Sequence, residues 1–199
     1  MTVKVPAKLP YILMGYKVPV LKTVEHEWEA YALEVLAGVL DGGNSARLSK
    51  ELIRGKQIAV SASAGYSLTS RMSSLFELDA TPAAGKTVYD METALKAEVA
   101  KLQTKLIEPL ELQRIKAQVL AGKVYDQDSN FNQAMQLGVL ESVGLDWHIQ
   151  DEYLKKINAV TAEQVREVAR KYLIEDHLSI AYLEPQAINT QTTEKKGVK

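Results

Sequence analysis

The stretch Glu25-His26-Glu27-Trp28-Glu29-Ala30-Tyr31-Ala32-Leu33-Glu34-Val35-Leu36-Ala37-Gly38-Val39-Leu40 decides the fold of this chain. Its apolar side chains recur at steps of three and four residues, at Trp28, Ala32, Val35, Leu36, Val39 and Leu40. That spacing predicts a helix with one buried face, with Trp28 buried and the charged residues beside it in solvent. Gly42-Gly43 ends it, and Asn44 or Ser45 then caps a second helix through Ile53 that ends at Gly55.

Short β-rich segments surround these two helices. We expect strands at 11–19 and 58–66, at 74–80, where apolar and polar side chains alternate, and at 177–183, where Pro185 ends the strand. A polar turn at 67–73 predicts that the second and third strands form an antiparallel pair.

The rest of the chain is helical in pattern. We expect helices over 88–106, from Pro109 to a break at 126–130, and from there through Val143, with Gly144 as the stop. Thr161-Ala162-Glu163-Gln164 has the spacing of a capping box and predicts a helix to about Leu173. Strands at the start, middle and end with helices between them predict an α+β fold. In it, a mixed, largely antiparallel sheet is covered by helices on one face, as a two-layer sandwich.

The chain divides into three parts by composition. Residues 1–10 contain two prolines and no period, so we expect a linker or entering arm. Residues 11–185 form the folded domain, and residues 186–199 are polar, so we expect a disordered tail. A start at Met1 directly before the proline-broken arm favours a segment cut from a longer protein.

Overall composition excludes several classes of function. The 24 Lys and Arg residues balance 25 Asp and Glu residues, so the net charge of −1 gives no long-range attraction for nucleic acid or an anionic membrane. No apolar run reaches the roughly 18 residues that a transmembrane helix needs. The chain has no cysteine, which excludes disulfides, thiol nucleophiles and cysteine-bound zinc.

The sequence contains no catalytic constellation that can be named. His26, His148 and His177 are scattered, and His26-Glu27-Trp28-Glu29-Ala30 lacks the second histidine of a His-x-x-Glu-His zinc motif, so a charged helix face is the favoured interpretation. No Gly-x-Ser-x-Gly turn is present. The segment 42–48 resembles a phosphate-binding loop without its Gly-Lys-Ser/Thr ending, and a turn between two helices explains it better.

The order of the segments resembles that of one peptidase family. Gly15-Tyr16-Lys17-Val18-Pro19, the helix 31–40, Gly43-Asn44-Ser45-Ala46-Arg47-Leu48, the segment 52–62, the region 118–130 and the stretch from 157 to 185 follow each other as in the C-terminal domain of pitrilysin-type zinc peptidases, which include insulysin and the processing peptidases. The match covers about residues 9–185. It implies the two-layer sandwich of the processing-peptidase type.

In that family one domain carries His-x-x-Glu-His and zinc, and its inactive partner forms the opposite wall of a peptide chamber. The resemblance implies that this chain is the inactive partner, because Leu33, Leu36 and Ala37 stand where the zinc ligands would be. Family members place an Arg and a Tyr from this domain on the substrate. Arg54 matches the arginine, whereas Val60 stands in place of the tyrosine, and a helix-end arginine beside the helix dipole remains the alternative for Arg54.

The expected function is therefore a non-catalytic substrate-chamber domain of a zinc-dependent endopeptidase. The zinc is expected in a homologous partner domain, on the same precursor or on a separate subunit, and extended peptides are the expected ligands. The isolated chain is expected to be inactive, to bind no metal, and to contact neither nucleic acid nor membrane. The alternative is a structural or assembly subunit related to processing peptidases, without a peptide substrate. Family analogy favours the periplasm over the cytoplasm.

Overall fold

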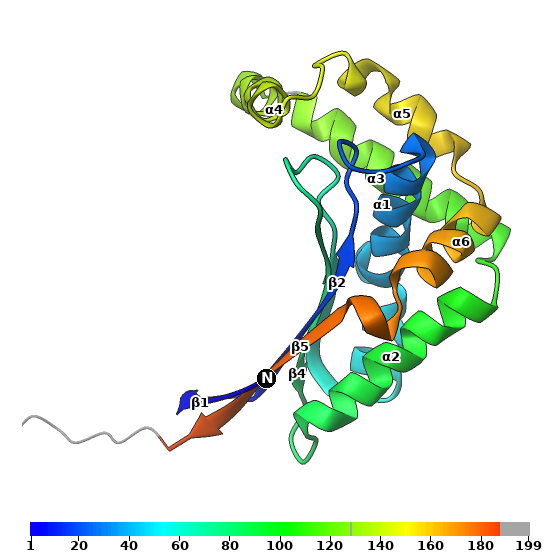
Figure 1. The fold of residues 1–199 in the computed structure, drawn as a ribbon. Helices are drawn as coiled ribbons and strands as arrows, with labels where there is room; N and C mark the ends of the chain where they lie inside the picture. Colours follow the sequence, from blue (N-terminus) through cyan, green and yellow to red (C-terminus); the bar gives the residue numbers. More distant parts are fainter. Residues whose placement is uncertain (128, 188–199) are drawn as a thin grey trace, which may run out of the picture.

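The computed structural model describes residues 1–127 and 129–187, and Figure 1 shows how the elements are arranged. The strands are β1 (Thr2–Pro6), β2 (Tyr11–Val18), β3 (Ala59–Gly65), β4 (Ser74–Pro82) and β5 (Leu178–Gln186). The helices are α1 (Glu27–Asp41), the π-helix η1 (Ser49–Gly55), α2 (Val88–Thr104), α3 (Pro109–Gln127), α4 (Asn130–Val143), α5 (Ile149–Ala159), α6 (Ala162–Tyr172) and the short 3₁₀-helix η2 (Glu175–His177).

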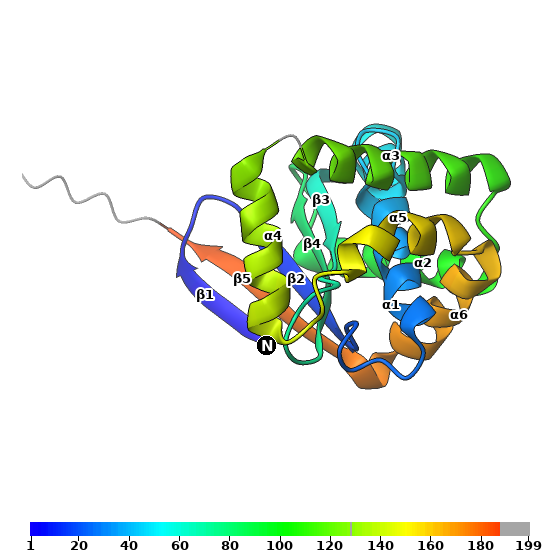
Figure 2. The ribbon, with the colours of Figure 1, turned by 90° about the horizontal axis from the view of Figure 1, so that it is seen from above.

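The five strands form one mixed sheet in the order β1-β5-β2-β4-β3. β1 runs parallel to β5, and the other three pairs of neighbours are antiparallel. The helices lie against one side of this sheet and leave the other side uncovered (Figures 1 and 2). The predicted fold class, a largely antiparallel mixed sheet with helices on one face, is confirmed.

The alternation in β4 explains why one face of the sheet is covered. Phe76, Leu78 and Ala80 are buried under the helices, whereas Leu75 and Glu77, which alternate with them, point to the open side. Successive side chains of a strand point to opposite faces, so this pattern fixes which face meets the helices. The helix side of the core is completed by α1, whose predicted apolar stripe is buried except for Trp28.

Several predicted boundaries are confirmed by local geometry. Thr161 caps α6 with the expected reciprocal bonds to Gln164, and Gly144 ends α4 in the left-handed conformation with φ of 75°. Gly43 has φ of 96° at the turn after α1, as a turn between two helices requires. Among the described residues, no helix combines the length and the apolar character needed to cross a bilayer.

Residues 1–10, for which the two prolines predicted a linker or entering arm, contain a strand. Residues 2–6 form β1, an edge strand that pairs in register with residues 182–186. β5 also continues through Pro185 instead of ending there, because β2 pairs with β5 only as far as Leu183 and Pro185 therefore has a single neighbouring strand. A residue without an amide hydrogen is tolerated at such a position. Of the expected tail at 186–199, Gln186 belongs to β5 and 188–199 lie outside the described residues.

The prediction for the start of α1 was wrong in two respects. Trp28 is only half-buried, whereas Glu29, expected on a charged solvent face, is 1% exposed. Its carboxylate accepts hydrogen bonds from Lys171 Nζ at 2.6 Å and from the Tyr172 hydroxyl at 2.7 Å. Lys171 and Tyr172 lie at the end of α6, so the buried carboxylate joins the first helix of the domain to the last long one.

We predict that Glu29→Gln lowers the free energy of unfolding by about 2 kcal/mol, because a buried hydrogen-bonded charge is replaced by a neutral amide that cannot satisfy both donors equally. Urea unfolding at neutral pH measures this as a lower midpoint with an unchanged slope. Glu25→Gln is the matched control, since exposed Glu25 lies 4.0 Å from the same lysine and should change stability by less than about 0.5 kcal/mol. Equal effects of the two substitutions would contradict the prediction.

Candidate functional site

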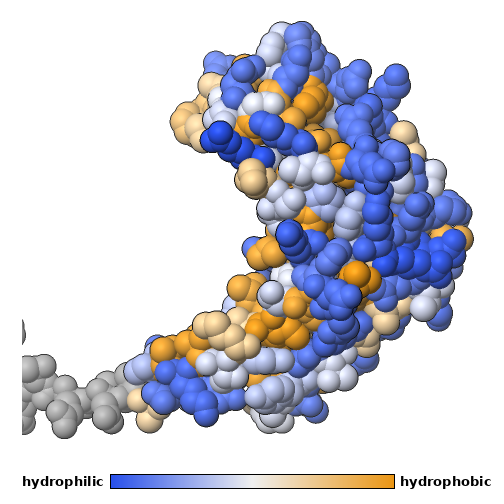
Figure 3. Space-filling model, in the orientation of Figure 1, coloured by the Kyte–Doolittle hydropathy of each residue, from blue (hydrophilic) through white to orange (hydrophobic). Residues whose placement is uncertain are grey.

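The molecule has the shape of a crescent, and the open face of the sheet forms its concave side (Figure 3). Tyr11, Leu13 and Leu75 remain 36%, 40% and 42% exposed on this face. A hollow of about 480 Å³ lies among side chains of β2, β4 and β5 here, and Gly15 forms part of it. A Cβ on Gly15 would lie 3.0 Å from Leu75 Cδ1, so glycine lets the leucine lie flat over β2. Burial and nearby Asp79 raise the pKa of Tyr11 to about 12, which keeps this phenol neutral at physiological pH.

Helix α4 stands out from the helical layer and overhangs the concave side (Figures 1 and 2). It exposes four large apolar side chains, those of Phe131, Met135, Leu137 and Val139. Large exposed apolar side chains gathered on one element are typical of surfaces that bind another molecule. Phe131, Met135 and Val139 recur at steps of four residues and therefore share one side of α4, whereas Leu137 lies on another side.

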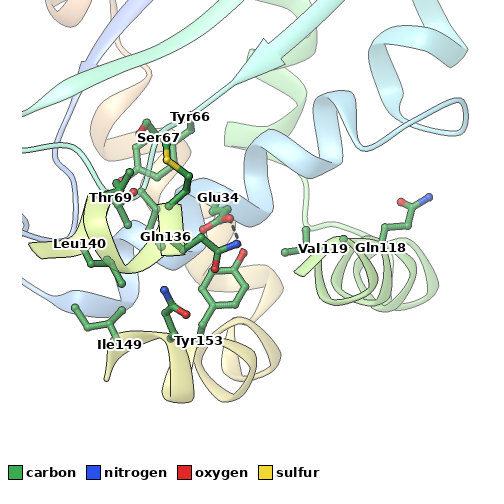
Figure 4. Close-up of a pocket in the computed structure, with 15 residues that line it drawn as sticks. Glu34, Tyr66, Ser67, Thr69, Gln118, Val119, Gln136, Leu140, Ile149 and Tyr153 are labelled. Atoms are coloured by element: carbon green, nitrogen blue, oxygen red, sulfur yellow. Dashed lines mark hydrogen bonds between the residues drawn. The ribbon is translucent and has the colours of Figure 1, made fainter. Parts of the chain in front are cut away.

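A cavity of about 610 Å³ lies where α4 meets the body of the domain (Figure 4). Five elements contribute to its wall: α1, the loop between β3 and β4, α3, α4 and α5. The described residues that line it are Glu34, Tyr66, Ser67, Leu68, Thr69, Gln118, Val119, Gly122, Met135, Gln136, Val139, Leu140, Ile149, Gln150 and Tyr153. This volume is in the range of small-molecule and peptide side-chain pockets.

Two tyrosine hydroxyls in this cavity are held by hydrogen bonds. The Tyr153 hydroxyl donates to Glu34 Oε1 at 2.5 Å, and the Tyr66 hydroxyl donates to the Pro19 carbonyl at 2.8 Å. Burial raises the pKa of both phenols well above the usual value, so both stay protonated at physiological pH. A neutral phenol whose proton is held by an acceptor is a poor nucleophile and a poor base.

Helix α5 was missed in the sequence although it supplies part of this cavity. Ile149, Tyr153 and Ile157 recur at steps of four residues, and this spacing was the available signal for an amphipathic helix. Tyr153 and Ile157 are buried. Just before the helix, Trp147 stacks on His148 with ring centroids 3.6 Å apart, and the His148 side chain is 62% exposed.

The sheet ends at β3, and this edge lies next to the residues that the family resemblance selected. Val60 is 59% exposed and falls at the register shift between Ala59 and Ser61, which distorts the pairing with β4. Near the other end of β3, Asp41 accepts a hydrogen bond from the Ala64 amide at 3.2 Å. Burial raises the pKa of the Asp41 carboxyl, and this hydrogen bond opposes the shift. The exposed residues of β3 are therefore Val60 and Ser61, near its beginning, whereas Ala59 is buried.

Arg54 lies in η1, directly before this edge, and its side chain is exposed. One of its guanidinium nitrogens donates to the Asn44 carbonyl. Arg54 helps to line a hollow of about 520 Å³, together with Ser45, Lys50, Gly55 and Arg114. Lys50 and Arg114 were missed in the sequence, because Arg114 belongs to a distant helix and no spacing along the chain relates it to Arg54.

An ion pair beside this hollow connects the turn just before η1 to α3. Arg47 Nε and Nη2 donate to the two oxygens of Glu111 at 2.9 and 2.8 Å, in a forked arrangement. Both side chains are mostly buried, with 18% and 19% exposed. The hydrogen bonds from Arg47 lower the pKa of Glu111, and those to Glu111 raise the pKa of Arg47. Such a bidentate pair sets both distance and orientation of the two helices.

The three positions that correspond to zinc ligands by the family resemblance have side chains that cannot bind a metal. Leu33 and Leu36 are fully buried in the core, and Ala37 packs against it. His26 is exposed just before α1, and His177 Nδ1 lies 3.1 Å from the Tyr172 carbonyl. In the part of the chain that the structure describes, no group of three or more His, Cys, Asp or Glu side chains could hold a metal ion.

Residues 2–119 match the sequence model of the peptidase M16 inactive domain. No curated protein sequence matches the chain. Among solved structures, a protease from Helicobacter pylori matches with a TM-score of 0.82 and 23% identity, over 92% of this chain and 44% of that one. The inactive peptidase domain of a proposed zinc protease from Bordetella parapertussis matches with a TM-score of 0.75 and 17% identity, over 96% of this chain and 98% of that one.

A chain of Complex III2 from Candida albicans also matches, with a TM-score of 0.76 and 18% identity, over 92% of this chain and 45% of that one. At these identities the structures establish a shared fold. The chain spans less than half the length of the Helicobacter pylori and Candida albicans chains. In both of these, the matching fold is thus one part of a longer polypeptide.

We predict that Glu111→Gln lowers the free energy of unfolding by about 1 kcal/mol at pH 7, since it leaves partly buried Arg47 without its counter-charge. The pKa of Glu111 is depressed in the folded protein, so its stabilising contribution is present above the unfolded pKa of about 4.3 and is lost as the pH falls through the folded value. The stability difference between the two proteins should therefore shrink from pH 7 to pH 3.

Urea unfolding across that pH range measures the difference. Glu108→Gln is the matched control, because this exposed carboxylate lies just before α3 and lines the same hollow as Glu111, and it should change stability by less than about 0.5 kcal/mol. A difference in stability between wild type and Glu111→Gln that grows towards low pH would contradict the predicted pH dependence.

Proposed function

This chain belongs to the family of peptidase M16 inactive domains, and on that premise we propose that it is the non-catalytic wall of a peptide chamber in a zinc-dependent endopeptidase. The concave side is the observation that carries the proposal. An apolar, uncovered sheet face lies under an overhanging apolar helix, with a cavity where the helix joins the body. Such a surface suits an extended peptide enclosed between two domains.

The catalytic zinc of the proposed enzyme belongs to a second domain. Leu33, Leu36 and Ala37 carry no atom that can coordinate a metal, so the residues of this chain do not fit zinc at the corresponding helix. We propose a homologous zinc-bearing domain as the partner, on the same precursor or on a separate subunit. The Helicobacter pylori protease chain, less than half of which is covered by the match, has room for such a second domain. By family analogy we propose a periplasmic location.

Peptides are proposed to bind by adding a strand at the exposed beginning of β3. Main-chain hydrogen bonds to a free sheet edge bind extended chains with little dependence on sequence. Arg54 lies directly before this edge and is the proposed substrate-contacting residue. Val60, which stands in place of the family tyrosine, supplies an apolar contact instead of a hydroxyl.

The second candidate is a structural or assembly subunit without a peptide substrate. Val60 favours it, because half of the expected substrate-contacting pair is absent. The similarity to a chain of Complex III2 shows that this fold also occurs in an assembly. This candidate would be supported if the chain formed a stable complex with the zinc-bearing partner and that complex neither bound nor cleaved peptides.

We predict that the purified chain contains no stoichiometric zinc and cleaves no unstructured peptide. Bound zinc and peptide cleavage should both be detected once the zinc-bearing partner is added. Metal analysis by mass spectrometry and cleavage of a fluorogenic peptide, with and without a chelator, measure this. The partner alone is the control and should bind zinc but cleave at least tenfold more slowly, because its chamber is incomplete. Stoichiometric zinc in this chain, with cleavage that a chelator abolishes, would contradict the proposal.

We further predict that Arg54→Gln lowers kcat/KM of the assembled enzyme about tenfold, because one charge-assisted contact to the peptide is lost. Arg71→Gln, which removes an exposed arginine from the loop between β3 and β4, is the matched control and should leave kcat/KM within twofold. Equal values of kcat/KM for the two variants would show that Arg54 does not contact the substrate.

A further inference from the structure

Three cationic side chains line one hollow beside η1. Lys50 and Arg54 come from η1, and Arg114 comes from the beginning of α3. The remaining described residues of the hollow, Ser45 and Gly55, are uncharged, so no carboxylate occurs among the residues that line it. The hollow therefore has a positive local charge although the whole chain is close to neutral.

The two arginines are held in place by the loop after α1. Arg54 donates to the Asn44 carbonyl, and Arg114 Nη2 donates to the next carbonyl, that of Ser45, at 3.2 Å. Successive carbonyls thus place two guanidinium groups next to each other. Each guanidinium has five N–H donors, so each retains donors for a ligand after this contact.

The surrounding structure keeps this arrangement rigid. The forked pair between Arg47 and Glu111 fixes α3 against the loop one turn before Arg114. On the other side, a Cβ at Gly55 would lie 2.9 Å from the Lys50 carbonyl oxygen, so the wide turn that presents Arg54 requires glycine there. π-helical turns of this kind occur frequently at functional sites.

Four glutamates line the adjoining hollow, and two of them are engaged by cations that do not line the hollow of Arg54. Glu111 is paired with Arg47, and Glu98 in the adjoining hollow is 2.6 Å from Lys101. Exposed Glu108 lines the same adjoining hollow as Arg114 and offsets part of the positive charge there. Glu51 lies 3.9 Å from Lys50 and partly neutralises the positive charge of that lysine. The positive charge available to a ligand therefore comes mainly from Arg54 and Arg114.

We propose that the hollow between Arg54 and Arg114 binds a carboxylate group of a peptide. Forked guanidinium donors match the two oxygens of a carboxylate in shape and charge. The proposal rests on the proposed function in one respect, namely that the carboxylate is carried by a peptide. Because η1 packs against the beginning of β3, a peptide that adds antiparallel to β3 brings its C-terminal end to this hollow. The carboxylate is then the C-terminus or an acidic side chain close to it.

The first test needs no peptide. The arginine Nε–H signals of the ¹⁵N-labelled chain are followed by NMR while N-acetylglycine or N-acetylglycinamide is added. We expect the signals of Arg54 and Arg114 to shift in a saturable way with the carboxylate compound alone, and Arg71 to stay unchanged as the internal control. Arg114→Gln should weaken the response of Arg54 at least fivefold. Equal responses to the acid and the amide, or an equal response of Arg71, overturn the proposal.

The second test identifies the source of the carboxylate. A fluorescent apolar peptide is compared by anisotropy in three forms: with a free C-terminus, with an amidated C-terminus, and amidated with one aspartate next to the end. We expect the free acid to bind about fivefold tighter than the plain amide. Arg114→Gln should remove this advantage, whereas Arg71→Gln should retain it. An advantage of the aspartate form over the plain amide assigns the hollow to acidic side chains as well.

The two proposals fail in different ways. Equal affinity of all three peptides overturns the carboxylate site and leaves peptide binding intact. If no peptide binds while N-acetylglycine still shifts the arginine signals, the chamber function is overturned and the carboxylate site stands.

Discussion

The constraint on which this structure depends is the one-sided burial of its sheet. The alternation in β2 and β4 gives one face to α1, α2 and α6, while on the other face Tyr11, Leu13 and Leu75 remain partly exposed and no helix of the described chain packs directly against that side. Removing those side chains from water would release free energy in proportion to the apolar area covered. The domain therefore presents a surface that is stable uncovered but gains from being covered, and α4 adds to the same side. The concave shape follows from the twist of the sheet and from the placement of α4 at its end.

Much of this arrangement could be predicted from local patterns. The stripe in α1, the alternation in β4 and the capping box at Thr161 each depend on spacing within one segment, and each was found in the predicted place. The family resemblance added the order of segments, and the match of residues 2–119 confirms it. Both kinds of signal are local, because each can be recognised within a short segment of the sequence.

The errors concern contacts between segments. Residues 2–6 form a strand because β5 offers a free edge, and the short alternation of Val3 and Val5 with polar residues was outweighed by the two prolines that follow it. Glu29 is buried because Lys171 and Tyr172 reach it from the far end of the chain, and single-sequence reasoning treats a glutamate with helical spacing as exposed. Arg114 becomes part of a hollow only because the Arg47–Glu111 pair sets α3 beside the loop at Asn44 and Ser45. That loop was first compared with a phosphate-binding loop, yet two of its carbonyls face arginines, so the positive groups there are side chains rather than backbone amides.

The parallel pairing of β1 with β5 has a mechanical consequence. The chain enters β1 at Thr2 and leaves β5 at Gln186, which lie at opposite ends of the paired region because the two strands run in the same direction. A force applied through the two chain ends therefore slides the strands along each other and loads their hydrogen bonds together, instead of breaking them one after another. The outermost strand pair is thus oriented to resist a pull between the two ends of the domain.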